Sequence, residues 1–373
     1  MVQGAGRSPA ADPPEATPEP PTPTRVGSVE QAVKAAGSTA DILDGLRCEF
    51  GMVGVSVPSR SRLSPVVIDP DFVEKAFEPL GVESADEARS LFDALGGAAL
   101  ACRKGKKPEQ PNQDNYFFCD TPGFRLLCVA DGHGEMGHWV SHWAARMALR
   151  LLLLELSDLQ AFPEDDEMLA SLFDTVHLAV KSVGEARGVD LSLSGTTFSI
   201  VVIDRQSGQA VLSWVGDSRC VVGRQGATRG VEVLHTSVDH KPQDMEERRR
   251  IIGSGGEVAR IHEDMPSRVF ARGKEAPGLA MSRAIGDLMA HSVGVIHAPS
   301  IKRFTLEANQ VLILCSDGVW EFMKNAEALR LVVGMGRDRG GEAAAALASE
   351  AWDRWIREEG NATDDITAMV LWW

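Results

Sequence analysis

Short apolar runs bounded by glycine and aspartate dominate the chain from about residue 97 onward. Runs of four to eight residues that are rich in Val, Ile, Leu and Phe predict buried β-strands. We therefore expect strands at residues 124–130, 198–204, 210–215, 310–315 and 366–371.

Between these runs lie segments in which apolar residues recur with the period of an α-helix. One helix is expected after His138, and it places a row of apolar side chains on one face: Val140, Trp143, Ala144, Met147 and Leu151. A second helix is predicted at 244–252, where Gly253 ends it. A third is predicted at 342–356, and its buried face comprises Leu347, Ala351, Trp352 and Trp355.

The order of these elements favours antiparallel sheets with flanking helices over a doubly wound parallel sheet. The GxxxxGK[ST] loop that binds phosphate in parallel α/β folds does not occur in the sequence. The predicted class is α+β.

The first 96 residues have a different composition. Residues 1–24 are rich in Pro, Thr, Glu and Ala and cannot bury enough apolar surface to offset the cost of ordering, so we predict a disordered tail. Residues 25–96 carry short helical patterns at 72–80 and 88–95 and are predicted to form an accessory extension whose function the sequence does not indicate. Residues 97–373 form the predicted main domain.

Composition narrows the function. The chain has 373 residues and a net charge of −15, from 53 acidic and 38 basic residues, which argues against nucleic acid as a partner. No run of about 18 apolar residues occurs, so no membrane span is predicted. The six cysteines show neither CxxC pairs nor zinc-ligand spacing, which indicates a reducing compartment, cytosol or nucleus. We expect a monomer.

Aspartates recur where predicted strands end. Asp131, Asp217 and Asp317 each follow an apolar run, and Asp131 and Asp317 are each followed by glycine. A single Asp-Gly after a strand is usually a turn, but this recurrence, together with Asp114 and the pair at 364–365, indicates a cluster of carboxylates.

Clustered carboxylates need cations, and oxygen ligands select Mg²⁺ or Mn²⁺ over zinc. Two such ions can hold a phosphoryl group and activate water. Spacing and composition thus predict metal-assisted hydrolysis, with phosphate as the favoured group.

Seven segments resemble, in order, the motif set of the type 2C metal-dependent protein phosphatases. They are Pro-Asn-Gln-Asp (111–114), Asp-Gly-His-Gly (131–134), Ser-Gly-Thr-Thr (194–197), Gly-Asp-Ser-Arg (216–219), Leu-Ala-Met-Ser-Arg-Ala-Ile-Gly-Asp (279–287), Ser-Asp-Gly-Val-Trp (316–320) and Thr-Asp-Asp-Ile-Thr (363–367). The resemblance runs from about residue 97 to the C-terminus. It implies a sandwich of two antiparallel sheets covered by helices, and removal of phosphate from protein serine and threonine.

The resemblance also implies a role for each matching residue. Asp131 would bridge two ions, with the Gly132 carbonyl as a further ligand. Asp317 and Asp364 would complete the first ion's site, and Asp114 would hold the second ion.

Two further roles follow from the same motifs. Asp217 would bind a weaker third ion, and His133 would be the general acid toward the leaving alkoxide. The nucleophile would be water activated by the metal, and the substrates would be phosphorylated proteins.

Three features depart from the family pattern or extend it. Gln113 stands where many members carry Glu, and a neutral amide weakens a cation site. The loop at 103–107 offers several basic residues for substrate phosphate, of which we favour Arg103 and Lys104. Residues 238–277 resemble the family's flap, a mobile subdomain beside the active site.

Two competing hypotheses remain. Cys119 and Arg125 satisfy the Cys-x5-Arg spacing of cysteine-dependent phosphatases, but Asp120 would repel the substrate and Pro122 removes a backbone donor. The second hypothesis is a catalytically weak relative that serves as a regulatory or binding module, and Gln113 is its support. A dinuclear phosphatase with histidine ligands would need histidines that the motif set does not provide.

Overall fold

The computed structural model describes residues 52–55, 93, 95–107, 110–121, 123–159, 162–163, 165–227 and 230–373. The predicted tail at 1–24 lies outside the described residues, as do the helical patterns at 72–80 and 88–95 except for Asp93 and Leu95. Of the predicted extension, residues 52–55 are described as a strand of the main sheet.

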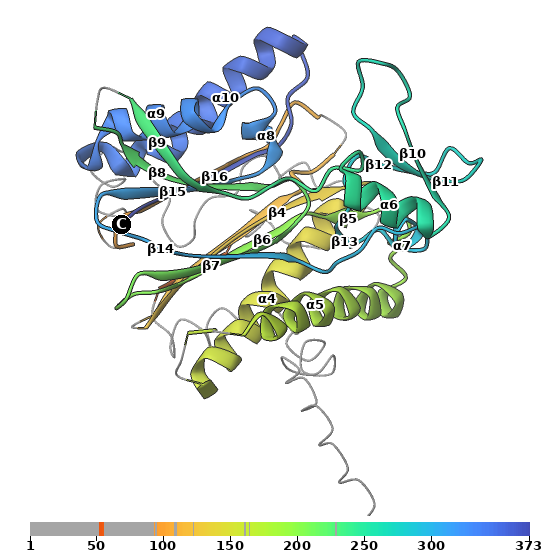
Figure 1. Ribbon diagram of the computed structural model, residues 1–373, viewed down its shortest axis with the longest axis horizontal. Helices are drawn as coiled ribbons and strands as arrows, with labels where there is room; N and C mark the ends of the chain where they lie inside the picture. The colour runs from red at the N-terminus through yellow and green to blue at the C-terminus, as the bar shows by residue number, and fades with distance from the viewer. Residues whose placement is uncertain are drawn as a thin grey trace, which may run out of the picture.

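Two antiparallel sheets form the centre of the described protein (Figure 1). The first sheet has the order β1-β3-β4-β6-β7-β14, and two short strands, β5 and β13, extend from β4. Its strands are β1 (Met52–Val55), β3 (Asp114–Asp120), β4 (Phe124–His133), β5 (Gly195–Thr196), β6 (Phe198–Asp204), β7 (Gln209–Val215), β13 (Ile285–Gly286) and β14 (Ser300–Thr305).

The second sheet packs against the first and has the order β2-β16-β15-β8-β9. Its strands are β2 (Ala98–Arg103), β8 (Arg219–Gln225), β9 (Val231–Thr236), β15 (Gln310–Cys315) and β16 (Ile366–Trp372). Because β2 pairs with β16, the first and last strands of the main domain lie side by side.

Helices cover the outer faces of both sheets, which gives four layers (Figure 1). The first sheet is covered by α4 (Gly137–Leu159) and α5 (Asp166–Arg187). The second is covered by α9 (Asn325–Met335) and α10 (Ala343–Glu359), which are linked by the 3-10 helix η1 (Arg337–Glu342). No described helix combines the length and apolarity needed to cross a bilayer.

Burial on both faces explains why the central strands appear as continuous apolar runs. In β6, Ile200 and Val202 face the helices while Val201 and Ile203 face the other sheet. In β15 the alternation is the same, with one set of side chains in each core.

The predicted fold class is confirmed: the protein combines antiparallel sheets and flanking helices. The predicted strands at 198–204 and 310–315 coincide with β6 and β15, and the predicted apolar face of α4 is buried throughout. In α10, Leu347 and Ala351 are fully buried, whereas Trp352 and Trp355 lie at its edge and are only partly buried.

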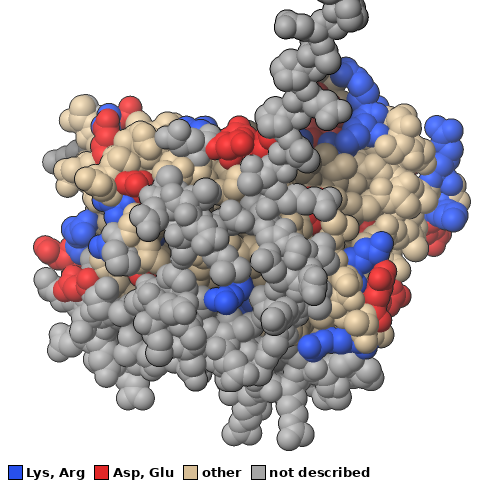
Figure 2. Space-filling model, turned by 90° about the horizontal axis from the view of Figure 1, so that it is seen from below, with Lys and Arg blue, Asp and Glu red and all other residues tan. Residues whose placement is uncertain are grey.

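A small three-stranded sheet projects beside the sandwich, at the right of Figure 1. It consists of β10 (Gly256–Ala259), β11 (Arg268–Ala271) and β12 (Pro277–Leu279), and it lies next to α6 (Met245–Gly253) and α7 (Leu288–His291). This subdomain has a core of its own around Ile251, Val269 and Val295. On the face drawn in Figure 2, acidic and basic side chains of the described residues are interspersed in small groups.

One buried carboxylate ties α6 to the rest of the protein. Glu247 accepts from Arg283 Nη2 at 2.6 Å and from Arg250 Nη2 at 2.7 Å. Arg250 also donates to the backbone oxygens of Ser282 and Gly294. Burial disfavours the Glu247 carboxylate, but the hydrogen bonds from both arginines outweigh this and lower its pKa to about 2.

We expect Glu247→Gln to destabilise α6 against local opening by on the order of 3 kcal/mol at pH 7. The folded pKa lies below the ordinary value of 4.5, so the stabilisation is present above pH 4.5 and is lost as the pH falls toward 2. Hydrogen exchange of the α6 amides at pH 7 and pH 3 measures both effects. Glu246→Gln, at the exposed neighbouring position, is the matched control. Equal protection of α6 in both variants at pH 7 would contradict the assignment.

Candidate active site

Carboxylates from both sheets meet at one edge of the sandwich. Asp114 begins β3 and faces Asp131 on β4, its Cα partner in the strand register. Asp317 follows β15 at the start of α8 (Asp317–Trp320), and Asp364 lies two residues before β16. The structure thus brings together four of the predicted metal-binding aspartates, which are separated by up to 250 positions in the sequence.

Two hydroxyl groups hold Asp114 across the gap between the sheets. Its Oδ2 accepts from Thr367 Oγ1 at 2.7 Å and from Ser316 Oγ at 2.8 Å. Both hydroxyls belong to the second sheet or its edge, and Asp114 is fully buried. Because charged acceptors make strong hydrogen bonds, this contact fixes Asp114 relative to Asp317 and Asp364.

The glycines after Asp131 and Asp317 allow the backbone to approach closely. A Cβ on Gly132 would lie 2.3 Å from the Gly137 carbonyl oxygen, and one on Gly318 would lie 2.0 Å from the Asp365 carbonyl oxygen. Any side chain at either position would push these segments apart.

The carboxylates strongly perturb one another. Burial raises the pKa of Asp131 well above its ordinary value, and the charges of Asp317 and Asp114 raise it further. Burial and the neighbouring Asp364 act in the same direction on the pKa of Asp317, and burial raises that of Asp114 to about 7. Adjacent buried carboxylates of this kind cannot all ionise without a cation to neutralise their charge.

These residues fit divalent cations. Asp317 Oδ1 is buried and has no hydrogen-bond partner among the described residues. A set of oxygen donors with several negative charges and few nearby positive charges is neutralised best by hard divalent ions. The donor set therefore suits ions of the Mg²⁺ and Mn²⁺ kind.

Asp365, the neighbour of Asp364, has a structural position. Its two carboxylate oxygens accept from the backbone N–H groups of Gly105 at 2.7 Å and Gln113 at 2.8 Å. Asp365 thereby anchors both ends of the basic loop. The Gln113 side chain is engaged as well, because its Nε2 donates to the Gly134 carbonyl at 2.5 Å.

Within this loop, Lys107 is the basic residue that contacts the carboxylates. Its Nζ donates to Asp364 Oδ1. Burial disfavours the ammonium form, but the charges of Asp364 and Asp365 outweigh it and raise the pKa of Lys107. The favoured Arg103 instead places its guanidinium 3.6 Å from the centre of the Trp352 ring, and Lys104 is partly buried on the same segment.

His133 lies at the end of β4 and pairs with Asp287. Its Nε2 is 2.6 Å from Asp287 Oδ2, and the Asp287 side chain is almost fully buried. Burial lowers the pKa of His133, but the charge of Asp287 and this hydrogen bond outweigh burial and raise it. Asp287 adopts a left-handed backbone conformation with φ 47°, and this conformation follows the short strand β13.

Two ion pairs join the segment 216–219 to the segment 239–241. Arg219 donates to both carboxylate oxygens of Asp239, at 2.9 and 2.7 Å. Lys241 Nζ lies 2.5 Å from Asp217 Oδ2. These contacts fix the segment that leads into the small subdomain, residues 239–241, next to Asp217, the predicted ligand of the third metal ion.

The Cys-x5-Arg hypothesis does not fit the structure. Cys119 is fully buried in β3, and burial together with the charge of Asp120 raises the pKa of its thiol to about 12. Arg125 donates to Asp120 and to the Gly96 carbonyl. Neither side chain is available to a phosphate ester.

Comparison with known proteins agrees with this geometry. The family model of protein phosphatase 2C matches residues 109–360. "Probable protein phosphatase 2C 34" of Arabidopsis thaliana is 32% identical over 310 residues, which cover 78% of this chain and 83% of that protein. "Probable protein phosphatase 2C 48" of Oryza sativa subsp. japonica is 33% identical over 301 residues, with coverage of 74% and 83%.

Among solved structures, the serine-threonine phosphatase 2C from Toxoplasma gondii shares the fold. The TM-score is 0.64 at 19% identity, with coverage of 86% of this chain and 98% of that chain.

The fold and the carboxylate cluster define a metal-dependent phosphohydrolase. The chain belongs to the protein phosphatase 2C family and is a metal-dependent protein serine/threonine phosphatase.

Three residues at the site were not assigned a role from the sequence: Lys107, Lys241 and Asp287. Each has its partner more than 20 positions away, at Asp364, Asp217 and His133. Asp287 is the last residue of the motif at 279–287, and this position was the feature of the sequence that could have indicated a role in the site. The roles assigned to the predicted ligands and to His133 stay predictions.

Proposed function

We propose that this phosphatase uses two Mg²⁺ or Mn²⁺ ions held by Asp114, Asp131, Asp317 and Asp364, with the Gly132 carbonyl as a further ligand. The supporting observation is that these carboxylates converge from two sheets and that burial and mutual repulsion raise the pKa values of Asp131 and Asp317. When bound, such ions would neutralise this charge, bind phosphoryl oxygens and make a water molecule more acidic.

Asp217 belongs to a weaker third site in this proposal. Its Oδ2 already accepts from Lys241, and the ammonium group provides part of the positive charge that a cation would bring. A third ion would have to compete with Lys241, so this site should fill only at high metal concentration.

Lys107 is the residue we propose to bind the substrate phosphate, in place of Arg103 and Lys104. It contacts Asp364 at the carboxylate cluster, and its side chain is about one-third exposed. Arg103 is stacked on Trp352 and would have to leave that ring to reach a phosphate.

We therefore expect Lys107→Gln to raise KM for a phosphopeptide and Ki for inorganic phosphate by about tenfold, the loss expected for one charge-assisted hydrogen bond. Lys104→Gln is the matched control and should stay within about twofold on the same scale. Steady-state kinetics at saturating Mn²⁺ measure both constants. If Lys104→Gln raised KM and Ki more than Lys107→Gln did, the sequence-based prediction that Lys104 binds the substrate phosphate would be favoured again.

His133 is proposed to protonate the leaving serine or threonine oxygen, and Asp287 to orient the imidazole and keep it protonated. The 2.6 Å contact between them supports this assignment. An aspartate that accepts from one ring nitrogen fixes the ring orientation and stabilises the imidazolium form.

A Mn²⁺ titration tests the proposal. The protein is stripped with EDTA, free Mn²⁺ is followed by its EPR signal, and hydrolysis of p-nitrophenyl phosphate is measured at each point. We expect two ions to bind per chain as the rate rises. Metal binding without hydrolysis would favour the catalytically weak module instead, and hydrolysis without metal would contradict the proposal.

A further inference from the structure

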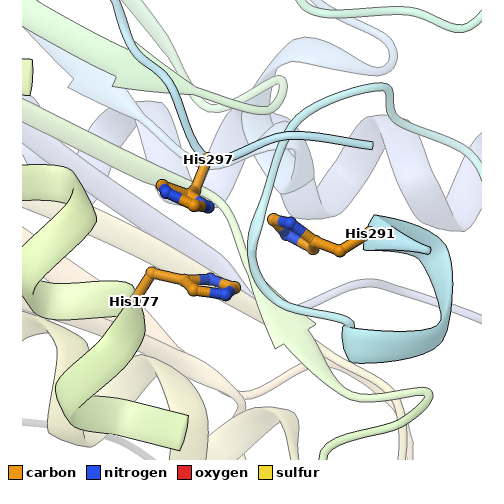
Figure 3. A group of neighbouring side chains, drawn as sticks. All are labelled: His177, His291 and His297. Carbon is orange, nitrogen blue, oxygen red and sulfur yellow. The ribbon is translucent and has the colours of Figure 1, made fainter. Parts of the chain in front are cut away.

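Three histidines meet away from the carboxylate cluster, between α5, α7 and the segment before β14. His177 lies in α5, His291 ends α7, and His297 follows six residues later (Figure 3). One ring nitrogen from each can be chosen so that all three lie within 4.8 Å of one another. Ring centres are 4.2 Å apart for His177 and His297, whose rings stack at an interplanar angle of 17°, and 4.4 Å apart for His177 and His291. To share an ion, these rings would have to turn about their side-chain bonds so that their in-plane lone pairs converge.

The outer hydrogen bonds of two rings leave one nitrogen of each without a proton. His291 Nε2 donates to the Ala284 carbonyl at 3.1 Å, and His297 Nε2 donates to Asp174 Oδ1 at 3.1 Å. In a neutral imidazole the other nitrogen, Nδ1, then carries a lone pair. His297 Nδ1 is buried and has no hydrogen-bond partner among the described residues. A carboxylate behind an imidazole, as Asp174 is here, is the arrangement that supports metal-binding histidines.

The third ring is linked to the active site. His177 Nδ1 accepts from the backbone N–H of Gly286 at 3.3 Å, so its Nε2 holds the proton. Binding a cation through Nε2 would move that proton to Nδ1, where it would face the Gly286 N–H, and this hydrogen bond would be lost. Gly286 directly precedes Asp287, the partner of His133.

Ligand chemistry distinguishes this group from the carboxylate cluster. Neutral imidazoles suit Zn²⁺ and other borderline transition ions, whereas carboxylates suit Mg²⁺ and Mn²⁺. Burial and the neighbouring imidazoles lower the pKa of His177 to about 2 and that of His291 to about 4, so protons do not compete for these rings near neutral pH. His291 and His297 are partly exposed, which gives an ion access and leaves a position for water.

We propose that His177, His291 and His297 form a second metal site, selective for Zn²⁺-like ions, whose occupation inhibits the phosphatase by releasing Gly286 and displacing Asp287 from His133. The inhibitory coupling rests on the proposed role of His133 and Asp287. The metal site itself does not depend on that role.

Cobalt(II) tests the site without an activity measurement. Tetrahedral Co²⁺ with imidazole ligands absorbs visible light far more strongly than octahedral Co²⁺ with oxygen ligands. The full-length protein is stripped with EDTA, supplied with excess Mg²⁺ and titrated with Co²⁺. We expect one strongly absorbing ion per chain, and its loss in both His291→Ala and His297→Ala. His262→Ala, at an exposed histidine in the small subdomain, should retain the band.

Zinc inhibition tests the coupling. In excess Mg²⁺, Zn²⁺ should inhibit the wild type at least tenfold more potently than it inhibits His291→Ala or His297→Ala, each compared with its own rate without Zn²⁺. Absence of the Co²⁺ band from the wild type, or its persistence in both variants, would overturn the metal site. A normal band with no difference in Zn²⁺ sensitivity would overturn the coupling. If the protein proved to have no phosphatase activity, the Co²⁺ band would still test the metal site, because the band does not depend on catalysis.

Discussion

Asp131→Asn and Asp317→Asn should each reduce phosphopeptide turnover by at least about 10³-fold without unfolding the protein. Both side chains lie at the meeting point of the two sheets, where burial raises their pKa values and no described lysine or arginine is bonded to either of them. Asparagine keeps the shape but removes the charge that would hold a cation. Turnover at saturating Mn²⁺ measures the loss, and Asp353→Asn on the exposed face of α10 is the control.

For the same two variants we also expect a change in thermal stability, which is measured independently of turnover. Removing one of several adjacent carboxylates relieves repulsion in the metal-free protein, so the melting temperature in EDTA should be equal to or above that of the wild type. The rise in melting temperature on adding Mn²⁺ should shrink. A variant with wild-type turnover and a wild-type Mn²⁺ shift would show that its carboxylate is not a metal ligand.

Asp287→Asn should lower kcat by about 100-fold on a phosphoserine peptide and by no more than about threefold on p-nitrophenyl phosphate. A serine alkoxide leaves only if it is protonated, whereas nitrophenolate leaves unaided. Because Asp287 contacts His133 at 2.6 Å, its replacement should affect only the substrate that needs the acid. Steady-state kinetics of both substrates measure the difference.

A double-mutant cycle checks that the two residues act together. His133→Gln should show the same dependence on the leaving group, and the double variant should be no slower than His133→Gln alone. Equal losses on both substrates, or losses that multiply in the double variant, would show that Asp287 acts on something other than the proton of His133.

The central strands could be predicted because both of their faces are buried. The sequences of β6 and β15 therefore contain continuous apolar runs with sharp ends. The edge strands β9 and β14 mix apolar and charged residues, as in Ser-Ile-Lys-Arg-Phe-Thr at 300–305, and give no such run. Helix α5 had its own signals, an Asp165 N-cap and a left-handed Gly188 at its end, yet it was not among the predicted helices.

The sequence predicted the part of the candidate site that lies at the ends of strands. Asp131 and Asp317 follow apolar runs that are visible in the sequence, and the structure brings them together with Asp114 and Asp364, which lie at or just before the start of a strand. The choice of Lys107 over Arg103 depends on the ring of Trp352, some 250 positions away, and on the path of the loop that Asp365 anchors. Contacts of this kind follow from the tertiary fold, and no local pattern encodes them.

The most direct test of the central claim is phosphate release from phosphoserine and phosphothreonine peptides by EDTA-treated protein, before and after Mn²⁺ is added and with or without thiol alkylation. We predict no release in EDTA, full activity on addition of Mn²⁺, and no effect of alkylation, because Cys119 is buried with a pKa of about 12. Release in EDTA, or loss of the Mn²⁺-dependent activity on alkylation, would contradict hydrolysis at the carboxylate cluster.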